Sequence, residues 1–72
     1  MEDLKEMIEE AINSPCIYCG VVLLMSDVSF DHANPVSRGG LPGLENGVIC
    51  CKRCNSRKGD LTKDEYFNLL TA

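Results

Sequence analysis

Large side chains are scarce in this sequence. Its 72 residues include no tryptophan, one histidine, two phenylalanines and two tyrosines, so little material is available for a core. A chain of this length buries only about 60% of its unfolded surface. Small domains of this kind are usually stabilised by disulfides, a metal ion or a partner. We therefore expect a single domain over residues 1–72, in which the five cysteines contribute to folding.

Long apolar runs and targeting signals are also lacking. The longest apolar run, residues 21–25, is much shorter than the roughly 20 residues that a membrane helix needs. Residues 1–5 contain no basic segment leading into an apolar run, so they do not predict a signal peptide. These features predict an intracellular, cytoplasmic protein without a membrane partner. Cysteines in that compartment are reduced, which favours metal binding over disulfides.

The net charge of −4 is unevenly distributed. Five of the first ten residues are acidic and one is basic, whereas the remaining 62 residues carry six acids and six bases. A basic cluster over residues 38–58 beside an acidic arm predicts a phosphate-binding face and a separate packing element. A solvated charged surface is an equally good explanation of the charges alone. The bases of the cluster are Arg38, Lys52, Arg53, Arg57 and Lys58.

The apolar spacing predicts an amphipathic helix over residues 1–14. Its apolar side chains recur at intervals of three and four residues, so they form one stripe. The helix is expected to end before Pro15, because the residue before a proline is pushed out of the helical region. The stripe is expected to cover the core of this protein, and a dimer interface is the alternative. Its residues are Leu4, Met7, Ile8, Ala11 and Ile12.

Three short strands are expected in the middle of the chain. Residues 21–25 begin with two β-branched side chains, residues 28–30 alternate and lead into an Asp-His pair, and residues 48–50 follow an Asn-Gly turn signal. Residues 33–45 contain two prolines and three glycines, and we expect them to form a loop.

Two further helices are expected towards the C-terminus. Residues 51–58 form a candidate short helix, which Gly59 closes as a C-terminal cap. Thr62 and Glu65 have the spacing of a capping box, which opens a last helix over residues 62–71.

Four of the five cysteines form two pairs, each with two intervening residues: Cys16 with Cys19, and Cys51 with Cys54. Four thiolates in this pattern match the tetrahedral coordination of a structural zinc ion. Such a site leaves no position open for water, so the zinc is expected to fold the chain without reacting. Two disulfides are the alternative. Cys50 falls outside the spacing and is predicted to be a small buried side chain.

The segment between the cysteine pairs carries the single histidine. Several short sequence motifs surround this histidine in a distinctive order. These motifs are Asp31-His32, Pro35, Ser37-Arg38-Gly39-Gly40, Asn46-Gly47-Val48, Cys51-Lys52-Arg53-Cys54-Asn55 and Lys58-Gly59. In type and order they resemble the HNH endonucleases, also called ββα-metal or His-Me finger nucleases. The resemblance covers residues 16–59. It implies a small α+β fold, a ββα-metal finger stapled by a structural four-cysteine zinc and flanked by N- and C-terminal helices.

The resemblance also implies roles for four residues. It places the general base at His32 and the central asparagine, which holds the loop bearing that histidine, at Asn46. The ligands of a catalytic Mg²⁺ or Mn²⁺ fall on Asp31 and Asn55. The chemistry agrees, because neutral imidazole can accept a proton and these ions prefer oxygen ligands. Adjacent strand residues point to opposite faces, so Asp31 and His32 can share a site only if the strand ends or bends there.

The function implied by this resemblance is metal-dependent hydrolysis of DNA phosphodiester bonds. Nicking with low sequence specificity is expected, because one site cuts one strand and a small domain offers little surface for reading bases. The five bases of the 38–58 cluster are expected to bind backbone phosphates. The alternatives are a non-catalytic zinc module that binds nucleic acid or a protein partner, and a nuclease subunit of a phage or restriction assembly. The acidic N-terminal helix would then mediate a homodimer or a larger complex.

Overall fold

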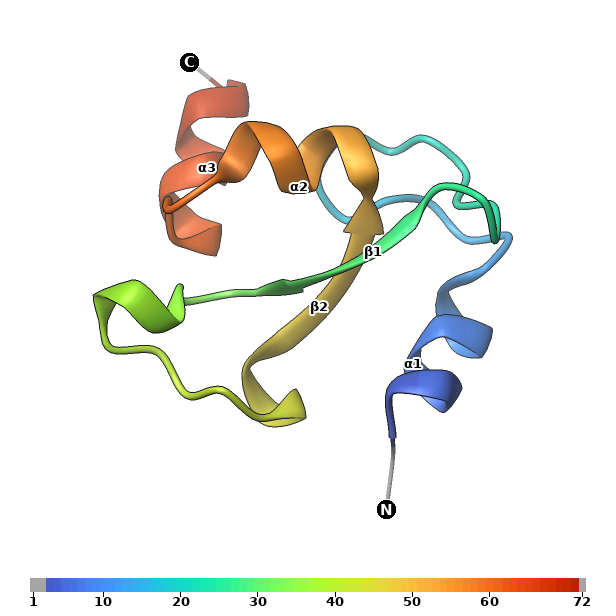
Figure 1. Ribbon diagram of the computed structural model, residues 1–72. Helices are drawn as coiled ribbons and strands as arrows, with labels where there is room; N and C mark the ends of the chain where they lie inside the picture. Colours follow the sequence, from blue (N-terminus) through green and yellow to red (C-terminus); the bar gives the residue numbers. More distant parts are fainter. Residues whose placement is uncertain (1–2, 72) are drawn as a thin grey trace.

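The computed structural model describes residues 3–71, which form a two-stranded antiparallel sheet with three α-helices around it (Figure 1). Strand β1 spans Val28–His32 and strand β2 spans Gly47–Cys51. The strands pair along their whole length, with Val28 opposite Cys51 and His32 opposite Gly47. Helix α2 (Lys52–Lys58) follows β2 directly and contacts both strands. This ββα unit confirms the expected small α+β fold.

Helix α1 (Leu4–Ala11) is shorter than the helix predicted over residues 1–14. The side chain of Asp3 caps its N-terminus. The helix ends early because Asn13 adopts a left-handed conformation with φ of 67° and donates its N–H to the carbonyl of Leu23. Residues 1 and 2 of the predicted helix lie outside the described residues. Part of the predicted stripe, Met7, Ile8 and Ala11, packs against the core.

The strand predicted at residues 21–25 is wrong. This segment forms only an isolated bridge, between Val22 and Pro15. Pro15 has no N–H group, so it cannot extend the bridge into a ladder. Leu23 is buried, whereas Val22 and Met25 are 52% and 66% exposed. The strands predicted at residues 28–30 and 48–50 are confirmed as parts of β1 and β2.

Helix α3 (Lys63–Thr71) begins with the predicted capping box. The N–H of Thr62 donates to Glu65 Oε1 at 2.9 Å, and the N–H of Glu65 donates to Thr62 Oγ1 at 3.1 Å. Gly59 closes α2 as expected, with φ of 51° and its N–H bonded to the carbonyl of Asn55. The first cap begins α3 and the second ends α2, and Cys54 of α2 and Tyr66 of α3 belong to the same core cluster.

The core lies where the cysteine segments, β2 and α3 meet. The ring of Tyr18 packs edge-on against the buried ring of Tyr66, with centroids 5.0 Å apart. Among residues 3–71, no helix combines the length and the apolar character needed to cross a membrane. The buried apolar side chains are Cys16, Tyr18, Leu23, Ile49, Cys50, Cys51, Cys54 and Tyr66.

Candidate active site and metal centre

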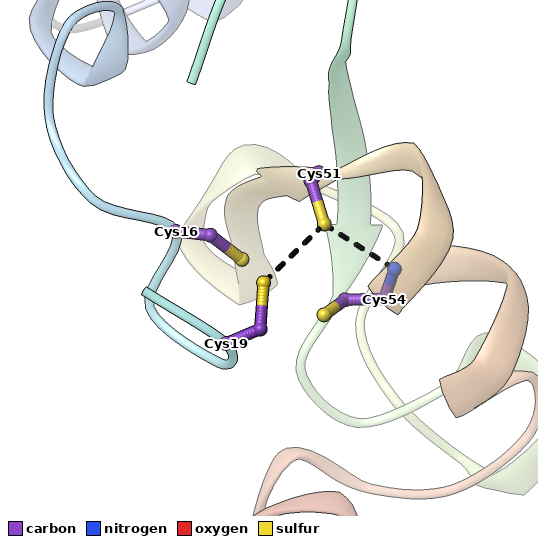
Figure 2. Close-up of side chains that lie close together, drawn as sticks. All are labelled: Cys16, Cys19, Cys51 and Cys54. Carbon is purple, nitrogen blue, oxygen red and sulfur yellow. Dashed lines mark hydrogen bonds between the residues drawn. The ribbon is translucent and has the colours of Figure 1, made fainter. Parts of the chain in front are cut away.

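The two cysteine pairs meet at one point beside the start of α2 (Figure 2). Their four sulfur atoms all lie within 4.8 Å of one another, and the sulfurs of Cys19 and Cys51 are 3.7 Å apart. Four sulfurs bound at about 2.3 Å to one tetrahedral ion are about 3.8 Å apart. All five cysteines are free thiols in this structure. The four sulfurs are positioned to hold a metal ion.

The surroundings shift the thiol pKa values of Cys19 and Cys54 in opposite directions. Hydrogen bonding from the backbone of Val21 lowers the pKa of the Cys19 thiol to about 7, which favours its ionised form. Burial raises the pKa of Cys54 to about 12. A metal ion must therefore displace a proton from Cys54, and the free energy of metal binding offsets the desolvation of this thiolate.

The side chain of Tyr66 is buried in the same core cluster as Cys54. Its side chain is 1% exposed, and its hydroxyl has no hydrogen-bond partner among the described residues. The neighbouring sulfur of Cys54 raises the pKa of Tyr66 to about 12, so the phenol keeps its proton. A buried hydroxyl needs an acceptor, and a metal-bound thiolate is a better one than a neutral thiol. Cys50, also fully buried, lies outside the cluster, as its spacing predicts.

His32 ends β1 with a half-buried ring in a fixed orientation. Its Nε2 lies 3.1 Å from the carbonyl oxygen of Pro42. A carbonyl can only accept a hydrogen bond, so Nε2 carries the proton and Nδ1 of the neutral ring is left as the acceptor. The ring of Phe30, two residues earlier on the same face of β1, packs edge-on against the imidazole at 5.1 Å.

Asn46 fastens the loop that follows His32. Its amide group donates to the carbonyls of Asn34 at 2.7 Å and Leu41 at 2.8 Å, and its oxygen accepts the N–H of Asn34 at 3.0 Å. These hydrogen bonds tie Asn46 to two other positions of the loop between the strands. Gly40 is required beside them, because a Cβ at this position would lie 1.8 Å from the carbonyl oxygen of Asn34.

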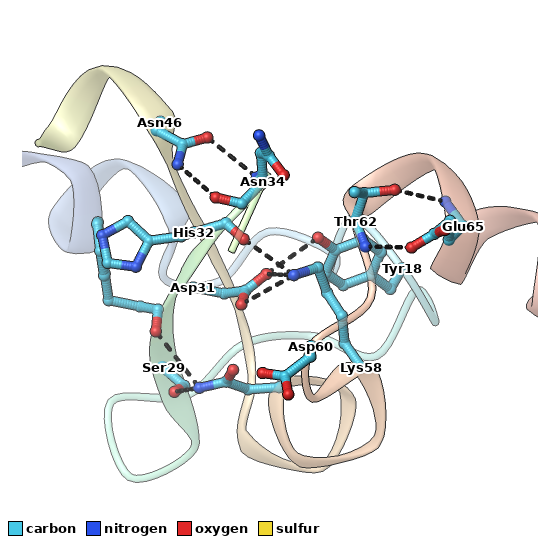
Figure 3. Close-up of polar contacts among 12 residues, drawn as sticks. Tyr18, Ser29, Asp31, His32, Asn34, Asn46, Lys58, Asp60, Thr62 and Glu65 are labelled. Atoms are coloured by element: carbon cyan, nitrogen blue, oxygen red, sulfur yellow. Dashed lines mark hydrogen bonds and ion pairs between the residues drawn. The ribbon is translucent and has the colours of Figure 1, made fainter. Parts of the chain in front are cut away.

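Asp31 points away from His32, toward α2 and the cysteine knuckle (Figure 3). Its carboxylate is 8% exposed and lies 3.0 Å from the amine of Lys58. The hydroxyl of Tyr18 donates to the same carboxylate at 3.3 Å. Burial, followed by this carboxylate, raises the pKa of Tyr18 above its usual range, so the phenol remains a donor. The regular strand geometry thus separates Asp31 from His32.

Asn55 lies on the Asp31 side of β1. Its amide group donates to the carbonyl of Phe30 at 3.3 Å and to the hydroxyl of Ser29. Because Asn55 follows Cys54 in α2, the helix that carries two of the clustered cysteines also places this amide against β1.

The side chains of Asp31 and Asn55 carry the oxygen ligands that suit a hard divalent ion. In this conformation, however, they are not arranged to bind one. Carboxylate and amide oxygens are the ligands that Mg²⁺ and Mn²⁺ prefer. Both carboxylate oxygens of Asp31, however, contact the amine of Lys58, and Asn55 presents its NH₂ group to β1. An ion at Asp31 therefore requires Lys58 to move.

The five bases of the 38–58 cluster do not form one exposed face. Lys58 is 1% exposed, so its predicted phosphate-binding role is wrong for this conformation: as residue i+4 from the buried Cys54, it faces inward. Arg38 pairs with Glu65 and lowers the pKa of that carboxyl to about 2. The side chain of Arg53 is exposed, and the neighbouring sulfur of Cys19 raises the pKa of its guanidinium. Lys52 and Arg57 are exposed on α2.

The sequence does not predict the contacts that two side chains, Tyr18 and Lys58, make with Asp31. Tyr18 lies between Cys16 and Cys19, so it was read only as part of a metal knuckle, although it links that knuckle to Asp31. Lys58 was grouped with surface bases by its charge. Its helical spacing from Cys54 is the signal that could have placed it inside.

Comparison with known proteins gives the same interpretation. The family model for HNH endonuclease matches residues 16–70. The chain is 28% identical over 68 residues to YoqL of Bacillus subtilis, named as a prophage-derived HNH endonuclease, and the match covers 83% of this chain and 30% of YoqL. It is 39% identical over 49 residues to the CRISPR-associated endonuclease Cas9 of Corynebacterium diphtheriae, which covers 67% of this chain and 4% of Cas9. The chain thus spans less than a third of each relative. This protein belongs to the HNH endonuclease family.

Proposed function

We propose that this protein is a metal-dependent DNA endonuclease that hydrolyses phosphodiester bonds with His32 as the general base. The observation that carries the proposal is the bond from Nε2 of His32 to the carbonyl of Pro42. It leaves Nδ1 as the basic nitrogen, so the ring can accept a proton from water without first changing tautomer. Asn46 supports this role by holding the loop that follows His32.

The proposed catalytic ion is Mg²⁺ or Mn²⁺, with Asp31 and Asn55 as its protein ligands. Because Asp31 and His32 point to opposite faces of β1 in this conformation, the proposal requires the end of β1 to bend so that both side chains reach one site. When bound, such an ion stabilises negative charge on the phosphate and on the leaving oxygen. The metal at the four cysteines is proposed to be zinc, with a purely structural role, because four thiolates leave no open coordination position. Reduced thiols suit an intracellular, cytoplasmic location.

DNA is proposed to be bound mainly through its backbone. Exposed arginine and lysine side chains neutralise phosphates without reading bases, which suits low sequence specificity. Because one chain offers one such site, it is expected to nick, and a double-strand break would require a homodimer or two binding events. The proposed phosphate-binding residues are Arg38, Lys52, Arg53 and Arg57.

Supercoiled plasmid tests this proposal. The zinc-loaded wild type should convert supercoiled plasmid to open circles when Mg²⁺ or Mn²⁺ is added, and only slowly without it. His32→Ala should reduce the rate by about 10² to 10⁴ fold, the usual contribution of a general base. Asn68→Ala, at an exposed position of α3, should leave the rate unchanged. An inactive but folded wild type, or an equally active His32→Ala variant, would contradict the proposal.

The second candidate is a non-catalytic zinc module that binds nucleic acid or a protein partner. The observation that favours it is the amine of Lys58, which occupies the oxygens of Asp31 that an ion would need. The prophage origin of YoqL supports a further variant, a nuclease subunit of a phage assembly. A gel-shift assay separates these alternatives, since a non-catalytic module retards DNA but leaves plasmid intact with every divalent ion.

A further inference from the structure

The amine of Lys58 lies in a cage of oxygen atoms. It is 3.2 Å from Asp31 Oδ1, 3.0 Å from Asp31 Oδ2 and 2.9 Å from the carbonyl oxygen of His32. Lys58 is 1% exposed and Asp31 is 8% exposed, so the amine and the carboxylate are buried, beside the half-buried His32. A carboxylate and a backbone carbonyl around one buried cation are also ligands that a hard divalent ion takes. The protein has thus placed its own cation in a site suited to a metal ion.

We propose that Lys58 is a tethered cation that holds Asp31 while no divalent ion is bound, and that an incoming ion must displace it. This inference rests on the proposed function in treating Asp31 as an ion ligand. Two cations a few ångströms apart repel each other strongly in a poorly solvated site, so Asp31 serves one of them at a time. A buried carboxylate with neither cation is unfavourable, so the amine returns when the ion leaves.

The position of Lys58 allows this exchange. It is the last residue of α2, next to Gly59, which has φ of 51°. Its ammonium sits on a flexible four-carbon stem and can move without a shift of the helix. Tyr18 stays on Asp31 through its hydroxyl, at 3.3 Å from Oδ2, and keeps the carboxylate oriented while the cations exchange. Lys58 is therefore a positioning residue that lowers the apparent affinity for the ion.

Titration with Mn²⁺ alone tests the competition. Binding to the zinc-loaded full chain is followed by the loss of the free Mn²⁺ paramagnetic resonance signal. Lys58→Met keeps the length of the side chain but removes its charge, and it should tighten Mn²⁺ binding by about tenfold or more. Lys5→Met removes a charge from the exposed face of α1 and should not change the affinity. Equal or weaker Mn²⁺ binding by a folded Lys58→Met variant overturns the inference.

A measurement on the wild type tests whether Mn²⁺ displaces Lys58, even if Lys58→Met fails to fold. Lysine amines are acylated briefly and the sites are quantified by mass spectrometry. Without Mn²⁺, Lys58 should react much more slowly than the exposed Lys5. Saturating Mn²⁺ should speed its modification by about fivefold or more. Unchanged protection of Lys58 at saturating Mn²⁺ overturns the inference, and so does Mn²⁺ binding that Asp31→Asn does not weaken.

Plasmid cleavage separates this inference from the proposed function. Cleavage by the wild type together with continued protection of Lys58 rejects the exchange and leaves the nuclease standing. Competition between Mn²⁺ and Lys58 without any cleavage rejects the nuclease and leaves the exchange standing.

Discussion

The two ends of the β1–β2 hairpin are held in different ways. At the end where Val28 faces Cys51, four cysteine sulfurs converge on the place of one metal ion. At the end where His32 faces Gly47, the connecting loop is held by the side-chain hydrogen bonds of Asn46 and by the Arg38–Glu65 pair. The first end depends on the binding of one metal ion, which is a strong interaction. The second end depends on several weak side-chain interactions. The metal end and the loop end of the hairpin can therefore be disrupted separately.

The largest effect is expected at the metal end. The Cys16→Ser/Cys54→Ser double variant removes two of the four ligands, and we expect it to lose cooperative thermal unfolding and bound zinc. Structural zinc contributes roughly 10–16 kcal/mol of apparent binding energy, which equals or exceeds the whole stability of a small domain. Circular dichroism melts and elemental analysis of the metal are the measurements.

Cys50→Ala is the matched control for the metal end. Cys50 is fully buried but lies outside the cluster, so this variant should keep one equivalent of zinc and lose only about 1 kcal/mol of unfolding free energy. A double variant that folds as well as the wild type would show that the cysteines are not the main support of this end.

An intermediate effect is expected at the loop end. Asn46→Ala removes three hydrogen bonds and should lower the unfolding free energy by about 1–3 kcal/mol while the metal stays bound. Plasmid nicking should fall by about 10 to 100 fold, because small displacements of a catalytic group lower rates strongly. Asn68→Ala is the control. Normal nicking by Asn46→Ala would mean that the loop needs no such fastening.

The smallest effect is expected from the Arg38–Glu65 pair, whose side chains are both exposed. The pKa of Glu65 is lowered to about 2 in the folded state by Arg38, so the pair stabilises the fold above the ordinary glutamate range. This contribution is lost as the pH falls through that range toward about 2. In Arg38→Met, the carboxyl carbon of Glu65 should titrate at a higher pH by nuclear magnetic resonance. An unchanged titration would assign the shift to the capping box instead.

The metal end could be predicted almost completely from the sequence. The spacing of the cysteine pairs identifies four ligands of one chemistry, and it also excludes Cys50. The strands of the hairpin followed from their alternation. The strand expected at residues 21–25 failed because composition does not show whether a partner strand exists, and Pro15 prevents one here.

The region around Asp31 could be predicted only in part. A motif gives the identity of neighbouring residues, but it does not show that β1 remains regular through His32 and so directs the two side chains to opposite faces. Net charge likewise groups Arg57 with Lys58, whereas the helix exposes the first and buries the second. Which side chains of a helix or strand face the core depends on how the element is rotated about its own axis. That rotation is fixed only when the element packs against the rest of the protein.

The joint between β2 and α2 limits where the chain can change in length. Cys51 is both the last residue of the strand and the N-cap of the helix, with its sulfur accepting the N–H of Cys54. One residue inserted after Cys51 would rotate the rest of α2 by about 100° relative to the hairpin. It would turn Cys54, Asn55 and Lys58 away from their partners in one step. Natural or engineered insertions are therefore expected in the loop between the strands, and none at this joint.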